Sequence, residues 1–115
     1  MPVVERDVVL PITRERAWEL ITEPAELEQW LADDVEFEPE VGGRVLADER
    51  EGVVEAVEPA ERVVFRWGDS RVEWRLDDHP DGIRFTVTEH RIAGDVHVWG
   101  PRLTALSAAA ALCPA

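Results

Sequence analysis

The stretch LPITRERAWELITEPAELEQW, residues 10–30, decides how the rest of this chain is organised. It predicts the end of a strand followed by two short helices. Thr13 is a suitable N-cap, because its hydroxyl can accept a hydrogen bond from a backbone N–H of the first turn. Pro24 disfavours helical geometry at Glu23 and suits the first position of a new helix. The stretch therefore indicates one helix that ends before Pro24 and a second that begins there.

Each of these helices has one apolar face that contains a tryptophan. The apolar positions of the first helix are Ala17, Trp18, Leu20 and Ile21, and those of the second are Leu27, Trp30 and Leu31. Large aromatic side chains dominate the burial of protein cores. We therefore expect Trp18 and Trp30 to be structural and mostly buried.

The rest of the chain, up to residue 92, has the pattern of short strands. The expected ranges are 3–10, 35–38, 44–48, 52–58, 62–67, 71–76 and 83–91. Gly68-Asp69 is typical of the turn of a tight hairpin. Short strands joined by tight turns indicate an antiparallel meander with one face buried.

The last segment, residues 95–112, has the pattern of a helix. Its apolar stripe consists of Val96, Trp99, Leu103, Leu106 and Ala110. Pro101 lies inside the segment, so the helix either begins near Pro101 or bends there. We favour a beginning near Pro101, with irregular chain over 95–100. One strand, two helices, a run of strands and a closing helix suggest a curved sheet that grips a helix.

These residues resemble the opening of the Aha-type family, the domain related to activators of the heat-shock-protein-90 ATPase. The matching positions are Ile12-Thr13, Ala17-Trp18, Thr22-Glu23-Pro24, Leu27 and Trp30. Ile12-Thr13 stands where the family has an alanine-proline pair, and Glu23 stands where it has an aspartate. Gly42-Gly43-Arg44 is similar to the family's turn into a strand, and Trp99, Leu103 and Leu106 are similar to its closing helix.

The resemblance covers nearly the whole chain, and it places the chain in the SRPBCC or START-like superfamily. It implies a single START-like domain over residues 1–115 with an α+β helix-grip fold, also called birch-pollen-allergen-like. In that fold a bent antiparallel sheet wraps around the C-terminal helix, and two short helices follow the first strand. The matching motifs are structural rather than catalytic, so the resemblance predicts fold more strongly than function.

Charge and composition exclude several classes of partner. The 115 residues carry a net charge of −13, with twelve arginines and no lysine. Such a chain repels phosphate backbones and anionic membrane surfaces, so we expect neither nucleic-acid binding nor membrane insertion. The single cysteine, Cys113, cannot form an internal disulfide. No apolar run approaches a membrane span and no signal peptide is visible, so we expect a cytoplasmic protein. The lysine-free composition, rich in alanine and arginine, suggests a GC-rich bacterial genome.

No residue set with the spacing of a catalytic or metal site is visible. His79, His90 and His97 have no metal-type spacing, although His90 and His97 could in principle bind a metal with Glu89 or Asp95. The carboxylates between residues 33 and 40 indicate a solvated acidic surface, because they lack the glycine and terminal glutamate of a calcium loop. Neither a nucleophile elbow nor a phosphate loop occurs. We therefore expect no catalytic residues, no metal and no cofactor.

Glu89 departs from the apolar pattern of its strand. It follows Ile83, Phe85 and Val87 on what should be the concave face. A carboxylate at such a position must be paired or reach water. In one interpretation the strand twists so that Glu89 meets solvent and pairs with Arg91. In the other, Glu89 is the polar end of an apolar pocket.

Three functions are compatible with these patterns. The first is non-enzymatic binding of a small hydrophobic ligand between the sheet and the C-terminal helix. The residues expected to line the cavity are Phe65, Trp67, Trp74, Phe85, Val87, Glu89, Trp99 and Leu103. The second, which the resemblance implies, is a co-chaperone-like module that contacts a chaperone or another protein. The third is a cavity enzyme such as a cyclase or hydrolase, which no visible catalytic set supports.

Overall fold

A computed structural model describes residues 3–91 and 99–112 of the chain. Its elements, in chain order, are β1 (Val3–Leu10), α1 (Arg14–Thr22), α2 (Pro24–Leu27), β2 (Val35–Phe37), β3 (Arg44–Ala47), β4 (Arg50–Glu58), β5 (Arg62–Trp67), β6 (Ser70–His79), β7 (Gly82–Arg91) and α3 (Gly100–Leu112). The order of two helices after the first strand, a run of strands and a last helix is the one expected from the sequence.

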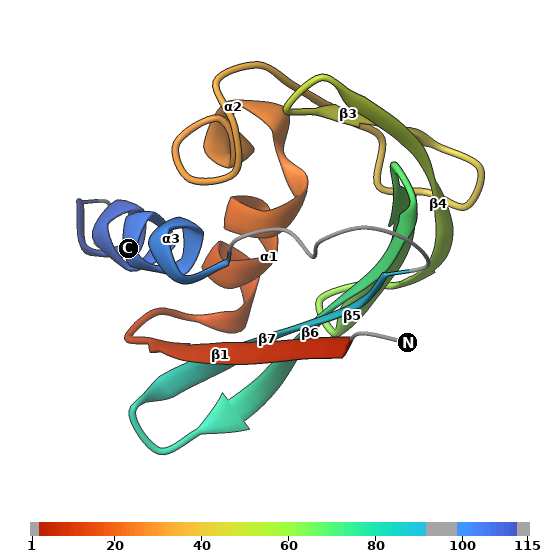
Figure 1. Ribbon diagram of the computed structural model, residues 1–115. Helices are drawn as coiled ribbons and strands as arrows, with labels where there is room; N and C mark the ends of the chain where they lie inside the picture. The colour runs from red at the N-terminus through yellow and green to blue at the C-terminus, as the bar shows by residue number, and fades with distance from the viewer. Residues whose placement is uncertain (1–2, 92–98, 113–115) are drawn as a thin grey trace.

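The strands form one antiparallel sheet in which the first strand pairs with the last. The order across the sheet is β1-β7-β6-β5-β4-β3-β2, so β2 to β7 are a meander and only β1 is out of sequence. The sheet is strongly bent, and α1 and α3 lie on its concave side (Figure 1). This is a helix-grip α+β fold, as the resemblance implied.

The first helix begins as the sequence predicts, and the second is shorter than predicted. The Thr13 hydroxyl accepts a hydrogen bond from the backbone N–H of Arg16 at 3.2 Å. Pro24 occupies the first turn of α2, but α2 ends at Leu27. Beyond that residue the backbone tightens, and Trp30 N donates to Leu27 O, three residues back. Trp30 lies in the core, where only 4% of it is exposed.

The strand ends follow from the turns between them. β6 runs from Ser70 to His79, longer than expected, because the tight turns at both ends allow pairing up to the turn residues. Gly68 has a φ of 60° in the β5–β6 turn, a conformation that glycine adopts at little cost. α3 begins at Gly100 with Pro101 in its first turn, which confirms the favoured alternative. Residues 92–98 lie outside the described part, so nothing tests the expected irregular chain there.

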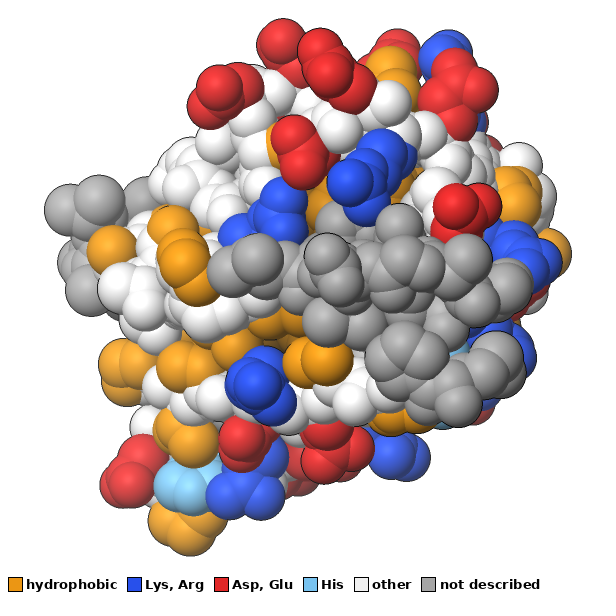
Figure 2. Space-filling model, in the orientation of Figure 1, with side chains coloured by type: hydrophobic (Ala, Val, Ile, Leu, Met, Phe, Trp, Pro, Cys, Tyr) orange, Lys and Arg blue, Asp and Glu red, His pale blue; other side chains and the backbone are white. Residues whose placement is uncertain are grey.

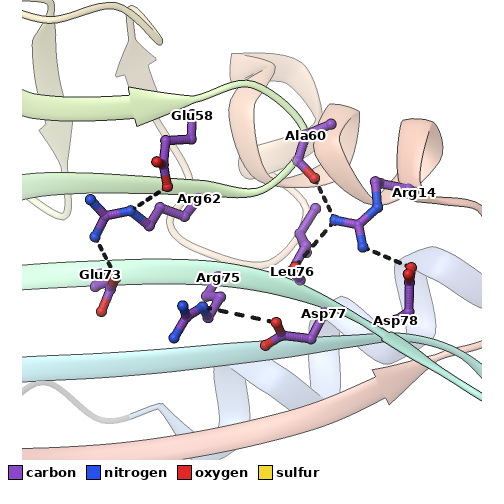
Figure 3. A network of polar contacts seen from close by, with 9 residues as sticks. All are labelled: Arg14, Glu58, Ala60, Arg62, Glu73, Arg75, Leu76, Asp77 and Asp78. Carbon is purple, nitrogen blue, oxygen red and sulfur yellow. Dashed lines mark hydrogen bonds and ion pairs between the residues drawn. The ribbon is translucent and has the colours of Figure 1, made fainter.

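A network of polar contacts fixes the beginning of α1 to the sheet (Figure 3). The Arg14 guanidinium donates to the carbonyl oxygens of Ala60 at 2.7 Å and Leu76 at 3.2 Å, and it pairs with Asp78 at 2.7 Å. Nearby, Arg62 bridges two carboxylates, and these hydrogen bonds raise the pKa of its guanidinium. Exposed ion pairs contribute little stability, so the network serves mainly to position α1.

Candidate functional site

The eight residues predicted to line a cavity all lie in the interior of the fold. They are Phe65 and Trp67 on β5, Trp74 on β6, Phe85, Val87 and Glu89 on β7, Trp99 directly before α3, and Leu103 in α3. None is more than 6% exposed. Strand alternation explains the grouping, because Trp74 lies opposite Val87 in the register and both point to the concave face. Whether these residues receive a ligand stays a prediction.

Aromatic rings in mutual contact fill this interior, with Trp74 at the centre. The ring centroids that surround Trp74 belong to Phe65 at 4.7 Å, Trp30 at 5.3 Å, Phe85 at 5.9 Å, Phe37 at 6.0 Å and Trp99 at 6.3 Å. Trp30 was expected in the core but not at this site, and Phe37 was not singled out. The alternation of Val35 and Phe37 around an exposed Glu36 was the available signal for Phe37.

Glu89 is fully buried on the concave face. Its side chain is 0% exposed, and its Oε1 accepts a hydrogen bond from the indole Nε1 of Trp99 at 2.9 Å. The interpretation in which the strand turns Glu89 to solvent is therefore wrong, because the alternation of β7 continues through this residue. Sequence reasoning did not find Trp99 as the partner, since the two residues belong to different elements.

Arg102 joins α3 to the segment after α2 and to the β3–β4 turn. Its Nε donates to the carbonyl oxygen of Leu31 at 3.0 Å, and its Nη2 pairs with Asp48 at 3.3 Å. The guanidinium lies over the rings of Trp67 at 5.3 Å and Trp99 at 5.7 Å. Burial lowers the pKa of Arg102, and the charge of Asp48 opposes that shift. The sequence carried no signal for this long-range contact.

The indole N–H of Trp74 differs from those of the other three buried tryptophans. Trp30 donates to Leu20 O at 2.8 Å, Trp67 donates to Ala47 O at 2.9 Å, and Trp99 donates to Glu89. Trp74 is 0% exposed as well, yet within residues 3–91 and 99–112 its Nε1 has no hydrogen-bond acceptor. A buried donor without a partner costs about 1–3 kcal/mol.

The three hollows described on the molecule lie at its surface, and none includes the eight predicted residues. Two of them flank the β3–β4 turn, with volumes of about 490 and 440 Å³ and several carboxylates in their walls. The third, of about 190 Å³, lies over the outer faces of β5, β6 and β7 between Arg62, Arg71 and His90. Figure 2 shows acidic side chains gathered on the upper side of the molecule, over α2 and β3.

The described residues offer no group of three or more histidine, cysteine or acidic side chains that could hold a metal ion. His90 is exposed on the outer face of β7, whereas His97, the other half of the metal alternative, lies outside the described residues. The carboxylates between residues 33 and 40 are exposed, as expected. Across the described ranges no helix is both long and apolar enough to cross a membrane.

Comparison with known proteins identifies the family. The profile described as "Activator of Hsp90 ATPase homolog 1-like protein" matches residues 11–99, which is most of the chain. The chain belongs to this family. The matched range runs from the turn before α1 to Trp99 and thus includes seven of the eight predicted lining residues, all except Leu103. No curated protein matches the sequence of this Hsp90-activator-like domain.

Solved structures show the same fold at low sequence identity. Protein MLL2253 from Mesorhizobium loti is 22% identical, with a TM-score of 0.82 over 94% of this chain and 96% of that one. DynU16, a putative protein in the dynemicin biosynthetic locus, is also 22% identical, with a TM-score of 0.80 over 92% of this chain and 46% of its own. CalU16 from Micromonospora echinospora is 19% identical, with a TM-score of 0.77 over 94% and 74%. At these identities the likeness concerns the fold alone.

Proposed function

We propose that this Hsp90-activator-like domain binds a small, largely apolar molecule between the concave face of its sheet and α3. The observation that carries the proposal is the buried Trp74 N–H, which meets no acceptor among the described residues. Proteins rarely leave a buried donor unpaired, so a donor without an acceptor calls for an explanation, and a bound ligand or an ordered water is one. The surrounding apolar walls, with a few polar groups among them, have the composition of a small-molecule site.

A ligand would enter this site by displacing rings, because the aromatic side chains contact one another in the structure. The polar contacts described at the beginning of α3 are those of Arg102 with Leu31 and Asp48 and the hydrogen bond from Trp99 to Glu89. Release of these contacts would let Trp99 and Leu103 move away from the sheet together. The proposal therefore involves a rearrangement of α3 rather than entry into an open cavity.

Two measurements test the proposal. Native mass spectrometry of freshly purified protein should reveal a bound small molecule, and the neutral dye Nile red should bind and alter tryptophan emission. Replacing Trp74 with phenylalanine should reduce the emission response, whereas Trp18→Phe, a change outside the ring cluster, should leave it intact. A protein that carries no small molecule and binds no Nile red would contradict the proposal.

The second candidate is a protein-interaction module, and the family description favours it, because it names an activator of an ATPase. The tightly packed rings are also compatible with a domain that acts through its surface. The test is the ATP turnover of a purified Hsp90-class chaperone with and without this protein. A reproducible increase in turnover would support the interaction module, and unchanged turnover would oppose it.

A further inference from the structure

The rings around Trp74 form what we call the aromatic cage, which consists of Trp74 with Trp30, Phe37, Phe65, Phe85 and Trp99. The indole N–H of Trp74 is a polar group inside this cage. The Trp74 ring contacts five other rings, and the stacked contact with Phe37 has an interplanar angle of 19°. The other buried indoles donate to protein acceptors, so the interior satisfies every tryptophan N–H that the structure describes as buried except this one. A ligand that enters the cage with a hydrogen-bond acceptor could accept the hydrogen bond of Trp74 Nε1.

The surroundings of Trp74 favour a neutral acceptor over an anionic one. Its described ring neighbours carry no charge, and the guanidinium of Arg102 lies over Trp67 and Trp99 instead. The nearest acidic group on the same sheet face is Glu89, which pairs with Val72 and is therefore diagonal to Trp74 in the register. An anion placed here would be buried near the carboxylate of Glu89, and the positive charge of Arg102 already interacts with Asp48 and Glu89, so the anion would be strongly disfavoured.

The geometry points to a ligand class. We propose that the molecule bound in the cage is a neutral, flat aromatic compound whose carbonyl or ether oxygen accepts the hydrogen bond of Trp74 Nε1. This inference rests on the proposed binding function and narrows it. A flat ring that displaces one of the protein rings can take its place against Trp74, because aromatic rings stack or meet edge to face at the centroid distances that the protein rings occupy there. The acceptor oxygen supplies the one hydrogen bond that the described residues do not.

Fluorenone and fluorene form a matched pair of probes, because they share a flat frame and differ mainly in one carbonyl oxygen. Both dissociation constants are measured by calorimetry for the wild type, for Trp74→Phe and for Trp18→Phe. The ratio of the fluorene constant to the fluorenone constant should fall about threefold to tenfold in Trp74→Phe, since one neutral hydrogen bond is lost. Trp18→Phe should keep the wild-type ratio.

The infrared carbonyl stretch of fluorenone bound to the wild-type protein gives a second readout that needs no variant. It should lie at a lower frequency than in an apolar solvent, as expected for a hydrogen-bonded carbonyl. Fluorene-9-carboxylate, an anion of similar shape, should bind more weakly than fluorenone.

The outcomes separate the two proposals. If both probes bind but the ratio is the same in Trp74→Phe, or the carbonyl stretch is that of a free ketone, the ligand class is wrong while the binding function stands. Tighter binding of fluorene-9-carboxylate would overturn the neutrality of the ligand in the same way. If neither probe nor Nile red binds the wild type, the binding function fails and this inference fails with it.

Discussion

Trp30 joins the turn after α2 to α1 through its indole N–H, and its ring lies in the core. Its Nε1 donates to Leu20 O at 2.8 Å, and its ring contacts both Trp74 and Phe85. Trp18, on α1, is partly buried and packs against the core. We therefore expect the two tryptophans of the opening motif to contribute unequally to stability, although the sequence pattern predicts burial for both.

Trp30→Ala should lower the free energy of unfolding by about 3–5 kcal/mol, the usual cost of deleting a buried aromatic ring. Trp18→Ala should cost clearly less, because part of that ring remains in water. Urea denaturation followed by far-UV circular dichroism measures both values. Equal losses in the two variants would contradict the assignment of Trp30 as the core residue.

Glu89 is expected to act on stability through Trp99. Glu89→Gln keeps an oxygen that can accept from Trp99 Nε1, whereas Glu89→Leu removes the acceptor and leaves that N–H buried and unpaired. The leucine variant should therefore be less stable than the glutamine variant by about 1–3 kcal/mol. Thermal and urea unfolding of the pair provide the comparison, and a leucine variant as stable as the glutamine variant would refute the structural role of this hydrogen bond.

At the residue scale, strand alternation was sufficient to bring six of the eight candidate residues to one face. It could not reveal which indole lacks an acceptor, because that depends on side-chain torsions and on partners far away in sequence. Arg102 escaped notice for the same reason, since its contacts with Leu31 and Asp48 cross between elements. The periodicity of a strand or helix predicts which side chains share a face, whereas hydrogen bonds between distant elements can be identified only once the fold is known.

Among the helices, α3 depends on Arg102 for its polar attachment to the rest of the domain. The guanidinium stacks on two tryptophan rings and binds a backbone carbonyl, and only its ion pair with Asp48 is near solvent, where the Asp48 side chain is 54% exposed. Planar stacking and a fork of donors are properties that lysine does not share. The stacking and the carbonyl contact should therefore matter more than the ion pair.

Arg102→Lys should destabilise the domain by about 1–2 kcal/mol, because it loses stacking on Trp67 and Trp99 as well as donor geometry. Asp48→Asn should cost less than about 1 kcal/mol, the usual contribution of an exposed ion pair. Asparagine also tolerates the left-handed backbone of that position, where φ is 52°. Urea denaturation of both variants tests the ranking, and a larger loss in Asp48→Asn would reverse our assignment.

The β3–β4 hairpin contains a turn with unusual residues. Asp48 and Glu49, which connect the paired residues Ala47 and Arg50, have φ values of 52° and 62°. Two consecutive positive φ angles are the signature of a type I′ turn, in which the second position favours glycine. Glu49 at this second position has a left-handed backbone conformation, which costs free energy for a residue with a Cβ.

Glu49→Gly should stabilise the domain by about 0.5–1 kcal/mol, because it relieves this backbone strain. Glu51→Gly is the matched control. It replaces a residue of the same type within β4 and should be destabilising, since glycine weakens a strand interior. The melting temperatures of the two variants should change in opposite directions, and a decrease in both would show that the turn is not strained.

The element boundaries show what local patterns cannot fix. The pattern extended the second helix to residue 31, because Leu27, Trp30 and Leu31 fit a helical face. The structure ends α2 at Leu27 and continues with a turn in which Gln29 and Trp30 donate to carbonyl oxygens three residues back, and Leu31 donates to one four residues back. Both conformations place Leu27 and Trp30 inward, so burial alone does not distinguish them. For α3, in contrast, Pro101 marked the first turn correctly because proline lacks the N–H that a helix interior needs.

For the molecule as a whole, the net charge of −13 governs encounters with other macromolecules. The acidic side chains over α2 and β3 form one visible part of this charge (Figure 2). Much of the arginine charge is already paired with carboxylates, as with Arg16, Arg44 and Arg62. Little positive charge is therefore left for a phosphate backbone.

We expect the protein not to bind duplex DNA at micromolar concentration, because every approach to the phosphates is opposed by the net charge. Fluorescence anisotropy of a labelled duplex at physiological salt provides the measurement. Lowering the salt concentration should not induce binding, since weaker screening strengthens the repulsion. Micromolar affinity at physiological salt would contradict this expectation.

The global fold was predictable because two independent kinds of information agreed. The alternating strands and the closing amphipathic helix suggested a sheet that grips a helix, and the opening motif resembled a family with that topology. The packing between the sheet and the helix was not predictable, because it depends on how the rings of Trp30, Phe37 and Trp74 contact one another in three dimensions. The sequence pattern and the resemblance were enough to predict the order of helices and strands, whereas the arrangement of the core side chains required the structure.

The aromatic cage also has an optical consequence. Trp30, Trp74, Trp99 and Trp67 form a chain of indoles with successive centroid separations of 5.3, 6.3 and 6.0 Å. At such separations the transition dipoles of neighbouring indoles couple, so these four chromophores contribute jointly to the circular dichroism of the protein. Their near-ultraviolet circular dichroism therefore reports on the geometry between β5, β6 and the beginning of α3, and a movement of α3 that carries Trp99 away would leave the Trp30–Trp74 pair separated from Trp67.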